Sequence, residues 1–109
     1  GQFEKMLDSF LAGKVQARQR DEIMNGKPWH DIDDGKVYFR SEDLFIYLEA
    51  RRFRYPSQHQ VWSWLRTVGG DRKAFRIKSK PVKVWSVPAP DFYQDDDDLN
   101  IPSGVTEEF

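Results

Sequence analysis

The 109-residue chain contains no cysteine. This absence excludes a disulfide framework and a thiolate zinc site and suits a reducing compartment, so we expect a cytoplasmic protein. The two histidines, His30 and His59, lie far apart in the sequence without a carboxylate at metal-ligand spacing, and we expect no metal site. No apolar run approaches the roughly 20 residues that cross a bilayer, and no secretory signal pattern opens the chain, so we expect no membrane partner.

The sequence also lacks the motifs of common catalytic sites. It has no Walker A motif, no glycine-rich phosphate loop and no serine or cysteine triad. His59 has neither a paired carboxylate nor a nucleophile nearby in the sequence, and general-base catalysis needs such a neighbour. The acidic run at residues 95–98 lacks the glycine and the terminal glutamate of a calcium loop. We therefore expect that this chain is not an enzyme and has no catalytic residues and no cofactor of its own.

Aromatic residues and unevenly distributed charge are what the sequence does contain. Eight Phe, four Trp and four Tyr bury a large area per residue, so a single core formed by about 80 residues is viable. The net charge of −1 conceals a division of the chain. Residues 36–88 carry twelve Lys or Arg and four acids, a net charge of +8, whereas residues 89–109 carry seven acids and no base. Such asymmetry indicates what the chain binds rather than how it folds.

The first third of the chain predicts one helix, one loop and one strand. Apolar residues at helical spacing predict a helix over residues 3–24, which Gly26 and Pro28 end. Turn-forming residues in segment 27–35 predict a loop, and the β-branched and aromatic run 37–39 predicts a short strand.

Two further helices are predicted in the middle of the chain. Ser41 is a candidate N-cap for a helix that continues to about Arg52. The second helix begins after Pro56, where Ser57 and Gln60 form a capping box, and the two glycines at positions 69–70 end it. The short connection between these helices is typical of a helix-turn-helix unit.

Period-2 alternation predicts a β-hairpin with strands over residues 74–78 and 82–87 and a turn at 79–81. The order helix, strand, helix, helix, hairpin indicates an α+β fold of the winged-helix type, with a β-hairpin wing, an N-terminal helix and a disordered acidic tail. The expected division of the chain is an N-terminal helix that packs on the domain (1–26), a winged-helix domain (27–88) and a flexible tail (89–109).

In a winged helix, the second helix of the pair and the wing lie against nucleic acid. Helical geometry places His59, Ser63 and Arg66 opposite the buried apolar stripe of that helix. Trp62 and Thr67 lie at the margins of this exposed face. Trp62 could stack on an unpaired base or simply cover the edge of the core. The cations would bind phosphates by counterion release and with little base specificity. The expected nucleic-acid-binding residues are His59, Trp62, Ser63, Arg66, Thr67, Arg72, Lys73, Arg76, Lys78, Lys80 and Lys83.

The C-terminal segment is acidic and ends on an aromatic residue. This pattern resembles the C-terminal tips of bacterial single-stranded DNA-binding proteins and of some phage replication proteins, in which the acids meet a basic surface and the aromatic ring enters a small pocket. Alternatively, the tail folds back on the basic domain and competes with DNA. The expected partner-binding residues are Asp95, Asp96, Asp97, Asp98, Glu107, Glu108 and Phe109.

A pattern of spaced aromatic and apolar residues resembles the C-terminal winged-helix region of phage and plasmid primase-helicase proteins. The residues that carry it are the runs 35–44, 61–66 and 82–88 with Phe53 and the glycines at 69–70, within a stretch of roughly 15–88. The resemblance implies a module that helps a replicative helicase or primase engage its template in a bacterial host cell. Reactions that need ATP and magnesium would belong to other domains of the parent protein. Independently of the resemblance, the first residue is Gly1 rather than Met, as expected for an excised piece of a longer protein or for a tag remnant.

Two alternatives to DNA binding in replication remain open. The chain could be a protein–protein docking module of a replication complex, or a winged-helix transcriptional regulator, which would predict a two-fold dimer and sequence-specific duplex binding. The sequence leaves the oligomeric state and the preference for single-stranded or duplex DNA undetermined.

Overall fold

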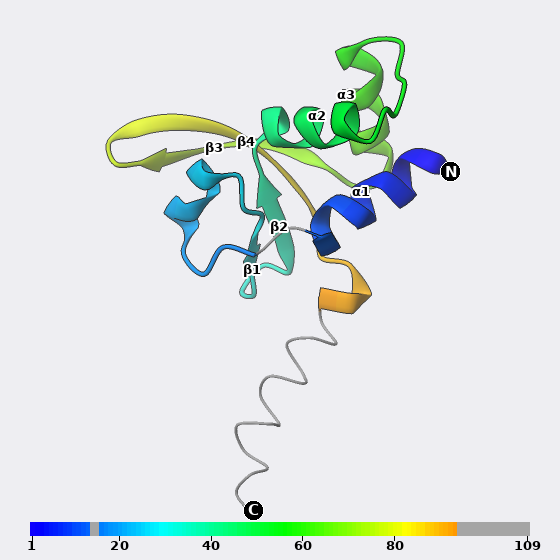
Figure 1. Ribbon diagram of the computed structural model, residues 1–109. Coiled ribbons are helices and arrows are strands. Elements are labelled where there is room, and N and C mark those ends of the chain that lie inside the picture. Colours follow the sequence, from blue (N-terminus) through cyan, green and yellow to red (C-terminus); the bar gives the residue numbers. More distant parts are fainter. Residues whose placement is uncertain (14–15, 94–109) are drawn as a thin grey trace, which may run out of the picture.

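A computed structural model of the chain describes residues 1–13 and 16–93 (Figure 1). The fold is α+β, as the sequence predicts, and its strands form a four-stranded antiparallel sheet in the order β1-β2-β4-β3. The elements are α1 (Gln2–Gly13), the 3-10 helix η1 (Arg20–Asn25), β1 (Trp29–Asp31), β2 (Lys36–Phe39), α2 (Ser41–Ala50), α3 (Gln58–Thr67), β3 (Asp71–Ile77) and β4 (Lys80–Pro88).

The sheet carries a separate apolar core on each face. The larger core lies between the sheet and the three α-helices, and β4 contributes Trp85 and Val87 to it. The smaller core lies on the opposite face, where Val82 and Val84 of β4 pack with Ile23 of the η1 segment. Successive residues of a strand point to opposite faces, so β4 joins both cores. In the described residues every buried side-chain nitrogen or oxygen has a hydrogen-bond partner.

The first helix is shorter than the sequence pattern predicts. Helix α1 ends at Gly13. The Ala17 N–H donates a 2.8 Å hydrogen bond to the Pro28 carbonyl, and Ala17 forms a bridge with Trp29 at the sheet edge. The apolar residues before Gly13 belong to the core on the helix side, whereas Ile23 belongs to the core on the other face. One straight helix cannot deliver side chains to both faces of a sheet, so the prediction of a helix over residues 3–24 was wrong.

The segment that was expected to be a loop contains an edge strand. Strand β1 pairs with β2, and Trp29 packs against Tyr38 and Phe75 with ring centroids 5.7 and 6.0 Å away. Burial raises the pKa of Tyr38, and a hydrogen bond from its hydroxyl to Asp34 Oδ2 raises it further. Burial alone would raise the pKa of Asp34, but the hydrogen bonds from Tyr38 and from the Lys36 N–H outweigh it and lower this pKa.

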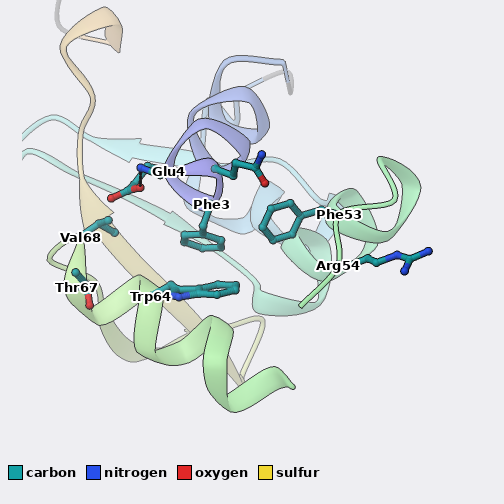
Figure 2. Close-up of a pocket in the computed structure, with 9 residues that line it drawn as sticks. Phe3, Glu4, Phe53, Arg54, Trp64, Thr67 and Val68 are labelled. Carbon is teal, nitrogen blue, oxygen red and sulfur yellow. Dashed lines mark ion pairs between the residues drawn. The ribbon is translucent and has the colours of Figure 1, made fainter. Parts of the chain in front are cut away.

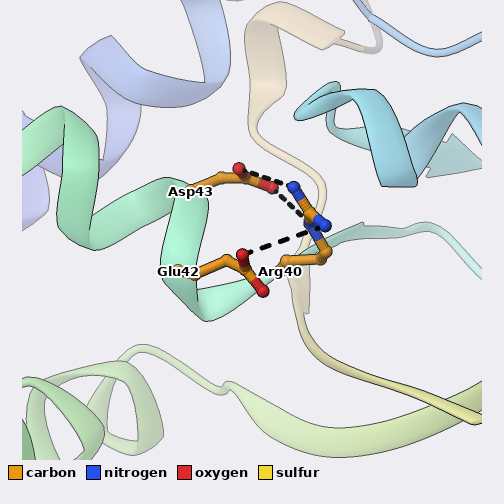
Figure 3. A network of polar contacts seen from close by, with 3 residues as sticks. All are labelled: Arg40, Glu42 and Asp43. Atoms are coloured by element: carbon orange, nitrogen blue, oxygen red, sulfur yellow. Dashed lines mark hydrogen bonds and ion pairs between the residues drawn. The ribbon is translucent and has the colours of Figure 1, made fainter.

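Helices α2 and α3 form where the sequence predicts them, but their N-termini are held differently. Ser57 accepts a hydrogen bond from the Gln60 N–H at 3.3 Å, which confirms the capping interaction at α3. Ser41 does not cap α2, because the helix begins at Ser41 itself and the capping position is Arg40. The Arg40 guanidinium instead bonds to Asp43 at 2.8 Å and lies 3.9 Å from Glu42, which ties the first turn of α2 to the end of β2 (Figure 3). This bond to Asp43 raises the pKa of Arg40.

The β-hairpin forms as predicted, but its turn is shifted. Ile77 pairs with Lys80, so the two-residue turn is Lys78–Ser79, with φ values of 54° and 68°, rather than residues 79–81. Both residues occupy the left-handed region that such tight hairpin turns require. The shift matters because it fixes which hairpin side chains share a face.

The folded part of the chain continues beyond the expected boundary at residue 88. Tyr93 is 1% exposed, and its hydroxyl donates a 2.7 Å hydrogen bond to the carbonyl of Leu11 in α1. The Tyr93 ring also lies edge-on to His30, with centroids 5.3 Å apart. Residues 89–93 therefore belong to the packed domain and not to a flexible tail.

Substitutions of two glycines by alanine are predicted to change the stability in opposite directions. A Cβ at Gly70 would lie 2.7 Å from the Leu65 carbonyl oxygen, whereas a Cβ at Gly13 would meet nothing within 4 Å. We expect Gly70→Ala to lower the free energy of unfolding by about 1–3 kcal/mol, because backbone must move. Gly13→Ala, the matched control, is expected to raise it by up to about 1 kcal/mol. Urea denaturation followed by circular dichroism measures both free energies. Equal stability of the two variants would contradict the close approach of Gly70 to the Leu65 carbonyl.

The contribution of Asp34, in the turn between β1 and β2, to the stability of the fold is predicted to depend on pH. The pKa of Asp34 is lowered in the folded protein, so its carboxylate stabilises the fold above the unfolded pKa of about 4, and this contribution is lost as the pH falls. Asp34→Asn is expected to lower stability at pH 7 by less than about 1 kcal/mol, because the turn is exposed, and the difference from the parent chain shrinks below about pH 4. Asp33→Asn, one position earlier in the same turn, is the control. A constant difference between pH 3 and 7 would disprove this role for the Asp34 carboxylate.

Candidate nucleic-acid interface

Helix α3 and the β-hairpin meet through two tryptophans. The rings of Trp62 and Trp85 stack with an interplanar angle of 11° and centroids 5.4 Å apart. Trp85 is only 3% exposed, and Trp62 covers it while also lying edge-on to Phe45 at 5.1 Å. One face of Trp62 is thus occupied by Trp85, so the geometry favours the core-covering role for Trp62 over base stacking.

Two exposed arginines lie against this pair. The Arg72 guanidinium is 5.2 Å from the centroid of Trp62 and 5.4 Å from that of Trp85, and the Arg66 guanidinium is 5.6 Å from Trp85. Arg66 comes from the last turn of α3 and Arg72 from the start of β3. A cation over an aromatic face gains about 0.5–1 kcal/mol at an exposed site. The contacts therefore limit where each guanidinium can lie while leaving it accessible.

An open hollow of about 540 Å³ adjoins the tryptophan pair. Four of the residues that the sequence predicts for nucleic-acid binding line it, and none of its lining residues is acidic. Ser41, Trp62, Arg72, Lys73, Ala74, Lys83, Val84 and Trp85 form the lining. The fold therefore gathers part of the predicted surface at one place, and this place is positively charged.

Three other predicted cations lie at the far end of the hairpin. Arg76, Lys78 and Lys80 border shallow hollows that they share with the η1 segment, which also contributes Asp21 and Glu22. Arg20 of this segment lies over the Phe75 ring at 5.0 Å and shares one hollow with Arg76. Arg20 was not among the predicted residues, because the pattern over residues 3–24 predicted one helix and no local signal shows that this segment packs beneath the hairpin.

Apart from Trp62, the neutral residues predicted on α3 do not line the tryptophan hollow. His59 and Ser63 are exposed on the helix. The Thr67 hydroxyl donates a 3.0 Å hydrogen bond to the Ser63 carbonyl. Thr67 also lines a different hollow of about 310 Å³ together with Phe3 and Trp64, whose ring centroids lie 5.2 Å apart with the planes tilted by 35° (Figure 2). Thr67 therefore belongs to the junction of α1 and α3.

Lys73 points to the opposite face of the sheet from Arg72. Its ammonium lies 5.8 Å from the centroid of Tyr38, on the side of the smaller core, and its charge attracts the carboxylate of Asp34. Lys73 therefore lies at the rim of the hollow and is partly engaged by the sheet itself.

The predicted partner-binding residues, at positions 95–98 and 107–109, lie outside the described residues. Across residues 1–13 and 16–93, no group of three or more His, Asp or Glu side chains is placed to hold a metal ion. None of the helices in this part of the chain is both long and apolar enough to cross a bilayer. No family model, no curated protein and no solved structure matches the chain.

Proposed function

We propose that this chain is a nucleic-acid-binding module of the winged-helix type, which holds phosphate groups beside the Trp62–Trp85 pair. One observation carries the proposal: Arg66 and Arg72 are held against the stacked rings, next to a hollow that has cations and no carboxylate in its lining. The order of helices and strands, and the pairing of β2 with the second strand of the hairpin, support the winged-helix type.

Because they lie against the tryptophan rings, the two arginines are well placed to bind phosphate. A guanidinium presents a planar fork of donors that matches a phosphate and can still stack on an aromatic ring. Because the rings already restrict Arg66 and Arg72, these side chains lose less conformational freedom on binding than free arginines would. Each neutralised phosphate also releases a counterion, which makes binding favourable and dependent on salt.

The proposed binding depends little on base sequence, because phosphate contacts position a protein without reading bases. The proposal includes a non-catalytic role for the module within a phage-type or plasmid-type replication protein, with recruitment of a second protein by the acidic C-terminal residues. The replication role is supported by the resemblance of residues 15–88 to primase-helicase proteins, and the recruitment by the resemblance of the acidic, Phe-ended tail to the tips of single-stranded DNA-binding proteins.

Removal of both arginine charges tests the proposal. We expect Arg66→Gln with Arg72→Gln to raise the dissociation constant for a fluorescent mixed-sequence oligonucleotide at least about tenfold at low salt, because two phosphate contacts are lost. The plot of log affinity against log salt should also become less steep by about 1.4 to 1.8. Fluorescence anisotropy measures both quantities, on single-stranded and duplex forms of the oligonucleotide.

The matched control is Arg51→Gln with Arg54→Gln, which removes the same charge from exposed residues between α2 and α3. This control is expected to change the dissociation constant less than about threefold, as a purely long-range effect of charge. Equal losses in the two double variants would show that net charge alone is responsible and that the tryptophan-held arginines are not the site.

A further inference from the structure

One face of the hairpin carries three of its cations, Arg72, Lys83 and Arg76, in a line along the strands. In the register of β3 and β4, Arg72 lies opposite Trp85, Ala74 opposite Lys83 and Arg76 opposite Pro81, and residues directly opposite each other point to the same face. This is the helix side of the sheet, because Trp85 belongs to the core beneath the α-helices. Figure 1 shows that the hairpin extends well beyond those helices, so this face is uncovered toward its tip.

The opposite face of the hairpin is covered. Ile77, Val82 and Val84 are buried there against Ile23, and Phe75 packs on the same cluster beneath Arg20. The η1 segment lies under the hairpin and supports it (Figure 1). The hairpin is therefore not a free loop, and the apolar side chains of this face are covered by the η1 segment.

The backbone positions of these three cations are evenly spaced along the hairpin. Arg72, the pair Ala74–Lys83, and Arg76 follow one another at steps of two residues, which is about 7 Å along an antiparallel strand. One nucleotide of an extended backbone spans a similar step. The Arg76 guanidinium donates a 3.2 Å hydrogen bond to the Ser79 carbonyl, which places it at the hairpin tip, where Arg76 also borders the η1 segment. Ala74 and Pro81 are small, so no bulky side chain stands between the cations.

Helix α3 is a poorer surface for phosphates. Arg66 is the one Lys or Arg within α3, and its guanidinium leans toward Trp85 and hence toward the hairpin. Phosphate contacts supply most of the affinity for nucleic acid, so the charged face of the hairpin outweighs the neutral face of α3. A protein element in a duplex groove meets two phosphate backbones. A single line of cations can follow only one backbone, and it therefore suits a single strand better than a duplex.

We infer that a single nucleic-acid strand lies lengthwise along the helix-side face of the β-hairpin, with successive phosphates at Arg72, Lys83 and Arg76. The strand runs from the Trp62–Trp85 pair to the hairpin tip, and the His59 and Ser63 surface of α3 stays free. This inference builds on the proposed function and names its substrate as a single strand rather than a duplex read by α3.

A charge placed in the middle of the line tests this path. Ala74 is exposed and lies opposite Lys83, so Ala74→Glu puts a carboxylate between the cations without disturbing the core. We expect it to weaken binding of a single-stranded oligonucleotide of about 12 nucleotides at least about tenfold. Ala74→Gln, which adds the same bulk without charge, and Ser63→Glu, which adds the same charge to α3, are both expected to stay within about twofold of the parent chain. Circular dichroism confirms the fold of each variant.

The outcomes separate this inference from the function on which it builds. Tighter binding of the single strand than of the matching duplex, with a loss confined to Ala74→Glu, supports the inference. Tighter binding of the duplex, a loss in Ser63→Glu as large as that in Ala74→Glu, or an equal loss in Ala74→Gln overturns it while the proposed function stands. If the parent chain binds neither oligonucleotide, the proposed function fails as well.

Discussion

The alternation of side chains along β4 is the constraint on which the rest of the structure depends. Trp85 and Val87 face the α-helices, while Val82 and Val84 face the η1 segment, and β4 pairs with both β2 and β3. A register shift of one residue would exchange the two sets and expose both cores. Because a small domain has little apolar area to bury, covering both faces of one sheet lets about 90 residues form a stable unit.

The same alternation places Arg72 and Arg76 on the face opposite the smaller apolar core, whereas Lys73 shares the face of that core. Strand β3 is an edge strand, and Arg72 and Arg76 project on the face that the helices leave open. Trp85, on this face, is covered by Trp62 and bordered by the two arginines. The burial of one tryptophan thus both joins α3 to the hairpin and fixes where the guanidinium groups lie.

Elements with strong local signals could be predicted from the sequence, and those with tertiary causes could not. The apolar stripe that contains Val61 and Leu65 and the cap at Ser57 fixed the position of α3, and the alternation after residue 71 revealed the hairpin. Strand β1 was missed because its three residues show no alternation and are held by pairing with β2. The burial of Tyr93 was missed because its partner, Leu11, lies at the other end of the chain.

For the candidate site, the sequence alone determined which residues carry positive charge and that they concentrate between positions 36 and 88. The cations predicted for the site are all exposed, since charged side chains rarely become buried without partners. Only the tertiary structure decided which cations act together: Arg66 and Arg72 meet at the tryptophan pair, Lys73 turns to the other face, and Lys78 joins the η1 segment. The reason is that these groupings depend on strand register and on contacts between residues distant in sequence, which no local pattern encodes.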